Sequence, residues 1–435
     1  MSHNTLRSAV RGRVLLPGDA AFEAARTPWN LTVDQPVAAV VHAEDADDMA
    51  AVVRYARDAG LSVTAQPNGH GASGDTAGAI LVRTRRLDRV EVDPLTRRAR
   101  VGAGANWGEL QAAAAQYGLT GLAGSSPVVS VVGYTLGGGL SWFGRAFGWA
   151  ADSVRAFDIV DADGQRARVT AESDPELFWA LCGGGGDFAL VTAMEFELYA
   201  APALFGGTVA WPAARTEAVR DAFLDITAQA PPELTVWLNR LQLPQMPPMV
   251  TIAAAYLGEP DRGRELLHRL DTIDGTLADT RRELSPAEVG AIVPEPTDPA
   301  PGLLRTELLT TLDATATEIL LHAPIDPLFG VQLRHLGGAL AAPTRGATPA
   351  FTETYAVALQ AIGSDPDAIT AAHATQKRII ADLGARITGH KPYTLLSPGD
   401  TPAAVFDAAT LTRLRTLKRS RDPRGVFRAN FPILG

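Results

Sequence analysis

The spacing of apolar and polar residues divides the chain into short strands and amphipathic helices. A β-branched run at 37–43 predicts a strand, and the amphipathic stretch at 45–59 predicts a helix. The acidic start of this helix and Gly60 after its end are typical helix caps. In the same half we expect further strands at 61–65, 79–84, 98–102, 153–161, 165–170 and 189–199, and helices at 107–117 and 174–181.

The pattern changes near residues 200–212, where longer helices begin to alternate with strands. We expect helices at 213–230, 260–270, 365–383 and 408–418, strands at 234–241 and 250–256, and an extended segment at 419–434. The Pro-rich stretches 244–248 and 294–301 are typical of exposed loops. The sequence therefore predicts an α+β fold with two domains and no internal repeat.

Composition narrows the function classes. Apolar residues make up 46% of the 435 residues and charged residues 20%, which suits a chain with packed cores. The net charge of −9 disfavours a nucleic-acid surface, and Cys182, as the one cysteine, excludes an intrachain disulfide. Without a long apolar run or an apolar leader at 1–19, we expect a cytoplasmic protein with no membrane span.

Three glycine clusters are candidates for ligand binding. The cluster at 102–108 resembles a dinucleotide fingerprint, but its third glycine is one position late and no acidic residue follows about 20 positions on. A tight strand-to-helix turn is therefore the better interpretation. At 67–74, glycines on both sides of His70 predict either an anion-binding nest or a plain surface loop. The glycines at 137–139 predict either a flat group lying against the backbone or tight packing.

Five segments together resemble a known family. They read PNGHGAS (67–73), VGAGANWGEL (101–110), GSSPVVSVVGYTLGGGLSWFGRAFGWAADSV (124–154), DPELFWALCGGGGDFALVT (174–192) and RLRTLKRSRDPRGVFRANFPI (413–433). Their order and spacing resemble the berberine-bridge-enzyme-like branch of the vanillyl-alcohol oxidase flavoproteins. The resemblance extends from Trp29 to Ile433.

The resemblance implies a two-domain fold of the PCMH type that binds FAD. The FAD-binding domain would span 1–200, with its core at about 31–200. A substrate domain at 201–390 would place an antiparallel sheet, covered by helices, over the flavin ring. The segment 391–435 would return to the FAD-binding domain.

The resemblance also implies the cofactor contacts. The loop 67–73 would hold the pyrophosphate, and His70 would bond covalently to the 8α-methyl carbon of the flavin. A neutral histidine has a nucleophilic ring nitrogen, and such a bond raises the oxidising power of the flavin and prevents its loss. The other implied cofactor-binding residues are Pro67, Asn68, Gly69, Gly71, Ala72, Ser73, Gly124, Ser125, Ser126, Val129, Gly133, Tyr134, Gly138, Gly139, Asp152, Val154, Val191 and Asn430.

Three positions refine the expected chemistry. Ser126 stands where some members of the family carry a second flavin-linked cysteine, so we expect attachment through His70 alone. Cys182 lies in another motif and is expected to be a packed core residue. Val129 matches the position that gates oxygen access, and valine there favours an oxidase over a dehydrogenase.

The catalytic base is expected at Tyr393. The family's Tyr-x-Asn motif is here Tyr393-Thr394-Leu395, without the asparagine. A phenol near a cation ionises more readily, and Lys391 would lie on the same face if this segment were a strand. The alternative is that Tyr393 packs against the flavin or the substrate.

Candidate substrate contacts come from two strand-like runs. Trp237 and Asn239 would share a face, as would Gln332 and Arg334. Because Arg334 and His335 alternate, only one of them can face a cleft, and a core position for His335 is the alternative to catalysis. The histidines show no metal-ligand spacing, so no metal is expected. The basic run 413–421 predicts a solvated helix face.

Together these features predict an FAD-linked oxidase acting on a small molecule, with O₂ as electron acceptor. The substrate would be an alcohol, sugar hydroxyl or amine of secondary metabolism. The alternatives are a dehydrogenase, an internal monooxygenase or an oxidative cyclase on the same fold, or an FAD-binding protein without catalysis. We expect no nucleic-acid or membrane partner, and a monomer or homodimer.

Overall fold

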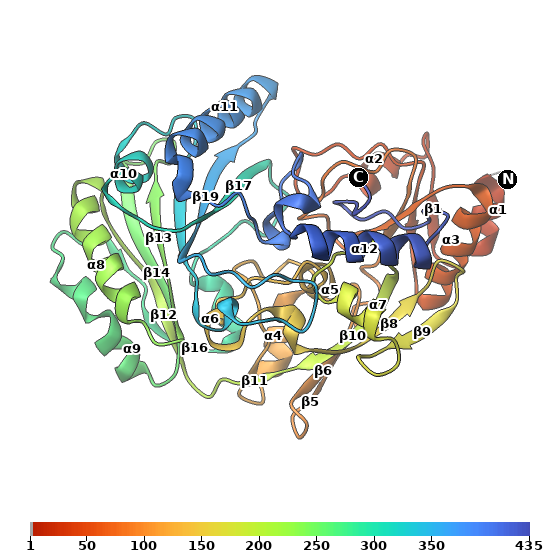
Figure 1. Cartoon of the computed structure of the whole chain (residues 1–435), viewed down its shortest axis with the longest axis horizontal. Helices are drawn as coiled ribbons and strands as arrows, with labels where there is room; N and C mark the ends of the chain where they lie inside the picture. Colours follow the sequence, from red (N-terminus) through yellow and green to blue (C-terminus); the bar gives the residue numbers. More distant parts are fainter. Residues whose placement is uncertain (1–2) are drawn as a thin grey trace.

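The computed structural model describes residues 3–435, which form two parts with a shared boundary (Figure 1). One part is built from the N-terminal half together with the end of the chain, and the other from residues 204–383. The domain boundaries predicted near 200 and 390 stay a prediction.

The first sheet lies at the N-terminus and has the strand order β1-β2-β4-β3. Strands β2, β4 and β3 are parallel, whereas β1 pairs antiparallel with β2. The elements are α1 (His3–Ala9), β1 (Arg13–Leu15), α2 (Phe22–Arg26), β2 (Ala39–His42), α3 (Ala46–Ala59), β3 (Val63–Ala65) and β4 (Ile80–Arg83).

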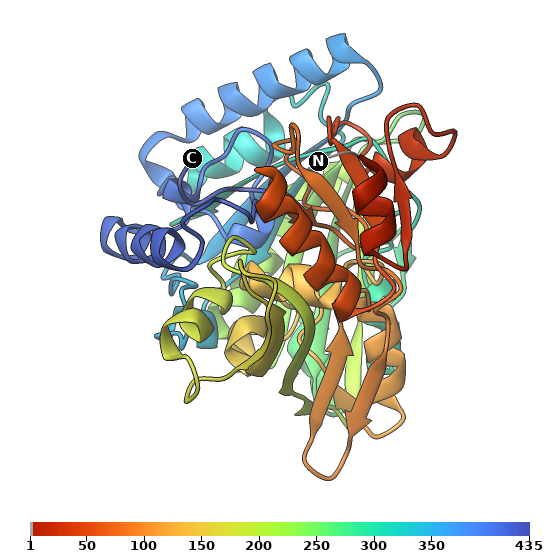
Figure 2. The ribbon, with the colours of Figure 1, turned by 90° about the vertical axis from the view of Figure 1, so that its right-hand side faces the viewer.

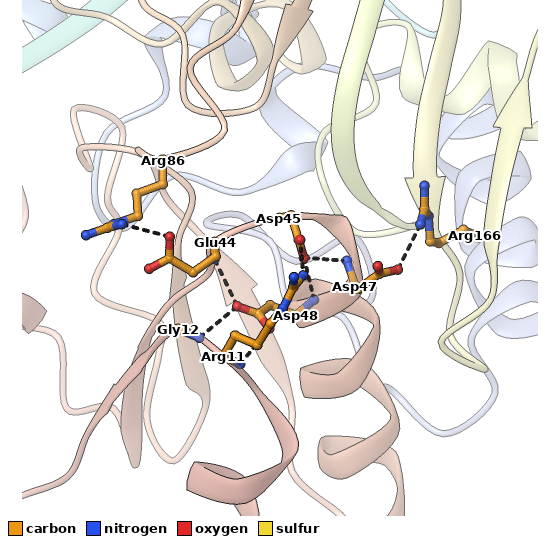
Figure 3. A network of polar contacts seen from close by, with 8 residues as sticks. All are labelled: Arg11, Gly12, Glu44, Asp45, Asp47, Asp48, Arg86 and Arg166. Carbon is orange, nitrogen blue, oxygen red and sulfur yellow. Dashed lines mark hydrogen bonds and ion pairs between the residues drawn. The ribbon is translucent and has the colours of Figure 1, made fainter.

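Helix α3 has the caps that the sequence predicts. The Asp45 side chain accepts hydrogen bonds from the backbone N–H groups of Asp47 and Asp48, and Gly60 ends the helix with φ of 68°. The carboxylate of Asp48 accepts the N–H groups of Arg11, Gly12 and Glu44 (Figure 3). Asp48 therefore fixes the chain before β1 against the start of α3.

The second sheet is antiparallel, with the order β5-β6-β10-β8-β9. Its hairpin β5–β6 projects from the body of the molecule (Figure 2). The strands are β5 (Val90–Asp93), β6 (Arg98–Gly102), β8 (Val154–Val160), β9 (Arg166–Val169) and β10 (Leu190–Glu197), and β7 (Leu119–Thr120) pairs separately with β11 (Tyr199–Ala200). The helices of this region are α4 (Trp107–Ala115), α5 (Val131–Leu136), α6 (Gly144–Phe147) and α7 (Pro175–Leu181).

The first glycine cluster is a packed turn. A Cβ atom on Gly102 would lie 2.0 Å from the carbonyl oxygen of Leu87, and one on Gly104 would lie 2.2 Å from that of Thr84. Asn106 then caps α4 in a capping box with Glu109. Close approach of the backbone therefore accounts for these glycines without a bound dinucleotide.

The third sheet has eight antiparallel strands and one covered face. Its order is β15-β12-β14-β13-β18-β19-β17, and β16 also pairs with β12. Helices α8, α9, α10 and α11 lie on the face turned away from the N-terminal half (Figure 1). The strands are β12 (Leu204–Pro212), β13 (Leu234–Leu241), β14 (Met249–Leu257), β15 (Ala278–Asp279), β16 (Arg282–Leu284), β17 (Gly302–Leu309), β18 (Gly330–His335) and β19 (Tyr355–Ile362). The helices are α8 (Thr216–Gln229), α9 (Pro260–Leu267), α10 (Ala314–Thr317) and α11 (Pro366–Leu383).

The end of the chain packs on the N-terminal half through α12 (Ala408–Arg421), which contacts α7. The basic run was predicted to be a solvated face, and for Lys418 this is wrong. Lys418 is 3% exposed, and its Nζ donates to Asp422 at 2.8 Å and to the carbonyl oxygens of Asp187 and Phe427. Asp187 in turn accepts the backbone N–H groups of Ala429 and Ile433. This cluster, Lys418–Asp187–Asp422, fixes the tail 426–433.

Within residues 3–435, none of the helices combines the length and the apolar character that crossing a bilayer requires.

Candidate active site

A cavity of about 1400 Å³ lies between the N-terminal half and the open face of the eight-stranded sheet. A cavity for one small ligand usually has about 300–1,000 Å³, so this volume suits a large cofactor together with a second molecule. Its walls come from loops 66–74 and 124–137, the segment 185–191, strands β13, β14 and β18, and the tail around residue 430.

His70 lies in the first of these loops and stacks on Trp29. The two ring centroids are 3.8 Å apart and the ring planes differ by 19°. Burial lowers the pKa of His70 to about 4, and its Nδ1 atom has no hydrogen-bond partner among the described residues. The imidazole is therefore neutral at neutral pH, and this lining residue has one buried ring nitrogen without a protein partner.

The tail holds the other end of this loop. The Nε2 atom of Gln66 donates to Oδ1 of Asn430 at 3.0 Å, and the Ser73 hydroxyl donates to the Asn430 carbonyl oxygen. Asn68 donates from Nδ2 to the carbonyl oxygen of Val128, which joins the loop to the second glycine-rich segment. Three segments far apart in the sequence thus form one wall.

This wall fits FAD. Five buried polar atoms in the cavity lining have no protein partner within residues 3–435: Gln66 Oε1, His70 Nδ1, Trp107 Nε1, Ser126 Oγ and Tyr134 OH. Buried polar groups normally have hydrogen-bond partners, so these atoms indicate a polar ligand. A Cβ atom on Gly186, which also lines the cavity, would meet nothing within 4 Å and would enter the free space.

Most of the predicted cofactor contacts line this cavity. They are Pro67, Asn68, Gly69, His70, Gly71, Ala72, Ser73, Gly124, Ser125, Ser126, Val129, Gly133, Tyr134, Val191 and Asn430. Their assignment to FAD stays a prediction.

Four predicted cofactor contacts do not line the cavity: Gly138, Gly139, Asp152 and Val154. A Cβ atom on Gly139 would lie 2.4 Å from the Tyr134 ring, so this glycine allows close packing behind the wall. Asp152 accepts the backbone N–H of Arg345 at 3.0 Å, and Val154 is buried in the core at the start of β8. These residues support the wall from behind.

The opposite wall carries a row of polar side chains across three strands. Arg334 Nε donates to Gln332 Oε1 at 2.6 Å, Gln332 Nε2 to Asn239 Oδ1 at 2.7 Å, and Asn239 Nδ2 to Thr251 Oγ1 at 3.0 Å. All four side chains line the cavity. The contact of Asn239, Gln332 and Arg334 with the substrate stays a prediction, and Thr251 was not singled out from the sequence.

Trp237 does not line the cavity, contrary to prediction. Its ring stacks on Trp142, with centroids 3.7 Å apart, and the guanidinium of Arg334 lies over it at 4.1 Å. Trp237 shares the face of Asn239 as expected, but the arginine side chain covers it.

Tyr393 lines the cavity from a 3₁₀ turn (Tyr393–Leu395) and not from a strand. Lys391 does not act on its phenol, because its Nζ pairs with Glu307 and Asp400. Burial raises the pKa of Tyr393, and the negative charge of Asp187 raises this pKa further. Its hydroxyl donates to the Phe431 carbonyl oxygen at 3.3 Å. These surroundings favour packing against a ligand over proton acceptance.

His335 points away from the cavity, as the alternation with Arg334 predicts. Its Nε2 atom accepts a hydrogen bond from Arg145 at 3.1 Å. Burial, with the nearby charge of Arg145 as a second cause, lowers the pKa of His335 to about 3. His335 is therefore a neutral core residue.

We expect His335 to make the fold less stable in acid. The unfolded chain binds a proton at a pKa of about 6.5 and the folded chain only near 3, so stability falls as the pH decreases between these values. The expected loss is about 3 kcal/mol at pH 4. Chemical denaturation at several pH values should show a shallower pH dependence in His335→Gln. If the free energy of unfolding of His335→Gln changed with pH as steeply as that of the wild type, this account would be contradicted. The control is His373→Gln, because His373 is exposed.

Several lining residues were not singled out from the sequence. Gln66 and Trp107 carry unpaired polar atoms, Trp29 stacks on His70, and Glu295 faces the same space. Gln66 adjoins the loop 67–73, which is a signal that could have found it, whereas Glu295 stands in a Pro-rich loop with no pattern of its own. Among residues 3–435 no group of three or more His, Cys, Asp or Glu residues is arranged to hold a metal ion.

Comparison with known proteins finds similarity to FAD-binding proteins. Residues 37–170 match the model of the FAD binding domain family. Over 293 residues the chain is 29% identical to (R)-6-hydroxynicotine oxidase of Paenarthrobacter nicotinovorans, which covers 65% of this chain and 63% of that protein. It is 35% identical over 206 residues to the FAD-dependent monooxygenase FUP4 of Fusarium proliferatum, and the match covers 46% of this chain and 40% of that protein. The matched regions thus span less than two thirds of these relatives.

Solved structures share the whole fold. The chain superposes on 6-hydroxy-D-nicotine oxidase of Arthrobacter nicotinovorans with a TM-score of 0.86 at 24% identity, covering 98% of each chain. For the wild-type BBE-like 1 protein of Physcomitrella patens the TM-score is 0.87 at 18% identity, covering 100% and 99%. Two structures of the grass pollen allergen Phl p 4 also match, each with a TM-score of 0.84 and covering 99% of this chain and 98% of that chain. The wild type, described as a glucose dehydrogenase, is 18% identical. An isoleucine-to-valine variant, described as a glucose oxidase, is 19% identical.

Proposed function

We propose that this chain is an FAD-binding flavoprotein of the vanillyl-alcohol oxidase superfamily, which the match of residues 37–170 and the shared fold support. It is an FAD-linked oxidase of a small molecule, oxidising an alcohol, a sugar hydroxyl or an amine of secondary metabolism. When bound, FAD would supply the redox chemistry: the substrate would lose a hydride from a C–H bond and a proton from its O–H or N–H group, and two electrons and two protons would convert O₂ to H₂O₂. The relatives named as oxidases and oxidoreductases support this reaction class.

The observation that carries the proposal is the pair of unlike walls around one cavity. One wall presents unpaired polar atoms and the neutral imidazole of His70, which suits a large polar cofactor. The other presents the hydrogen-bonded row of Asn239, Gln332 and Arg334, which suits a second, smaller molecule. A bound substrate would lie between the cofactor and this row.

In this proposal His70 holds FAD through the 8α-methyl carbon of the flavin. Its low pKa keeps the ring nitrogen unprotonated, and Trp29 fixes the ring plane. Ser126 has a hydroxyl where a second link would need a thiol, so the histidine bond is the single attachment. The protein acts in the cytoplasm as a monomer or homodimer.

The test is a screen of alcohols, sugars and amines with oxygen uptake and H₂O₂ measured together. An oxidase forms one H₂O₂ for each O₂ consumed. The second candidate function is an internal monooxygenase, which the monooxygenase-named relative FUP4 favours. It would consume O₂ with an oxygenated product and little peroxide. Substrate-dependent dye reduction without oxygen uptake would indicate a dehydrogenase.

We expect Val129→Ile to slow the reaction with O₂ selectively. Val129 lines the cavity, and the added methylene would narrow the space there. The rate of reoxidation by O₂ should fall about tenfold or more, the usual effect of one methylene in a fitted pocket. Stopped-flow mixing of the substrate-reduced enzyme with O₂ measures this rate, and dye reduction should stay close to wild type. An equal loss in both half-reactions would contradict a role in oxygen access.

A further inference from the structure

The guanidinium of Arg334 is held in a fixed plane at the cavity wall. It lies over the ring of Trp237 at 4.1 Å, and Trp237 stacks on Trp142 at 3.7 Å with an interplanar angle of 15°. Its Nε atom is occupied by the hydrogen bond to Gln332. Stacking and this one bond together fix both the plane and the rotation of the group.

The terminal nitrogens of this guanidinium have no protein partner among the described residues. No carboxylate among residues 3–435 forms an ion pair with Arg334. The charge of Glu295 and the phenol of Tyr134 both raise the pKa of Arg334 electrostatically, but neither group forms a hydrogen bond or an ion pair with it. Burial lowers the pKa of Arg334, yet a guanidinium stays protonated in proteins. Arg334 is half-buried in the cavity wall, so an anionic ligand would provide the bonded counter-ion that the protein itself does not supply.

The hydrogen bonds along the polar row of Arg334, Gln332, Asn239 and Thr251 all run in one direction. Each side chain donates to the next, from Arg334 through Gln332 and Asn239 to Thr251. The amide oxygens of Gln332 and Asn239 are thus occupied by protein donors. The row therefore offers a ligand N–H groups more than acceptor atoms, which suits oxygen-rich substrates.

We propose that the substrate carries a carboxylate, bound in a bidentate manner by the two terminal nitrogens of Arg334. This inference rests on the proposed function, which places the substrate, and not the flavin, against β18. The substrate class becomes a hydroxy acid or an amine bearing a carboxylate. Planar, paired N–H donors match the two oxygens of a carboxylate, and a charged hydrogen bond of this kind is stronger than a neutral one.

The test uses paired probes on the flavin-loaded protein: acetate, benzoate and phenylacetate, each compared with its amide. Binding is followed by the change in the visible flavin spectrum and, independently, by tryptophan fluorescence. Wild type should prefer the carboxylate in at least one pair. Arg334→Met should weaken that carboxylate by about 10- to 100-fold and leave the amide unchanged. Arg334→Lys should retain part of the preference.

A matched control is Arg264→Met, because Arg264 also lies over an aromatic ring, Phe205, and pairs with Asp261 outside the cavity. It should bind every probe as wild type does. Absence of a carboxylate preference in every pair, or the same preference in Arg334→Met, would overturn the proposal. Sulfite binding to the flavin is measured in the same variants. If Arg334→Met lost sulfite binding but kept carboxylate binding, Arg334 would act on the cofactor and the proposal would be overturned. A protein without flavin would instead refute the proposed function, and the fluorescence titration would still test the carboxylate site.

Discussion

Replacement of His70 by alanine is expected to convert tightly retained flavin into releasable FAD. Wild-type protein precipitated with acid should keep its yellow colour in the pellet, because a covalent bond survives denaturation. In His70→Ala all of the flavin should pass to the supernatant. The basis is the unpaired Nδ1 atom in the cavity wall and the pKa of His70 lowered to about 4. The visible spectrum of both fractions measures the distribution.

Ser126→Ala provides the control, since Ser126 lines the same cavity and removal of its hydroxyl leaves the histidine bond in place. Its flavin should stay in the pellet. Flavin released from the wild type would show that FAD is bound without a covalent link. Flavin retained by His70→Ala would place the link on another residue.

Lys418→Met is expected to lower the free energy of unfolding by about 3–5 kcal/mol, the usual cost of removing one partner from a buried ion pair. Lys418 and Asp422 are both almost fully buried, and their atoms are 2.8 Å apart. Methionine keeps most of the volume but leaves the carboxylate of Asp422 without its cation. A lower denaturant midpoint, with the slope of the transition unchanged, would measure the loss.

Arg421→Met tests whether burial is the cause. Arg421 lies on the same helix and pairs with Asp174 at 2.9 Å, but its side chain is 44% exposed. An exposed pair contributes at most about 1 kcal/mol, so the midpoint should hardly move. Equal losses in the two variants would mean that the buried cluster has no special role in stability.

Local signals made part of the fold predictable. Helix α3 has its acidic cap and its terminal glycine within a few residues of its own apolar stripe, and the predicted strand 234–241 has the same bounds as β13. Strands β17 and β19 were not predicted. They form by pairing with each other across about 50 residues, and such pairing leaves little trace in the local pattern.

In the candidate site, too, residues in compact local motifs could be predicted, whereas their partners far away in the sequence could not. His70 was accessible because its loop carries a compact motif, whereas its partner Trp29 is 41 positions away. Periodicity placed Trp237 on the correct face of β13 but not under Arg334, which belongs to another strand. Lys418 looked like one of several surface cations, since Asp187 precedes it by 231 residues.

The loop around His70 is held by the tail of the chain, and this has a consequence for biosynthesis. Gln66 and Ser73 obtain their partner, Asn430, from a residue that is made more than 350 positions later. While Asn430 is still inside the ribosome, the loop around His70 lacks this support and the cavity is open on one side. The proposed capture of FAD therefore follows the emergence of Asn430, because a nascent chain that has folded only its first sheets lacks the residue that holds both ends of the His70 loop.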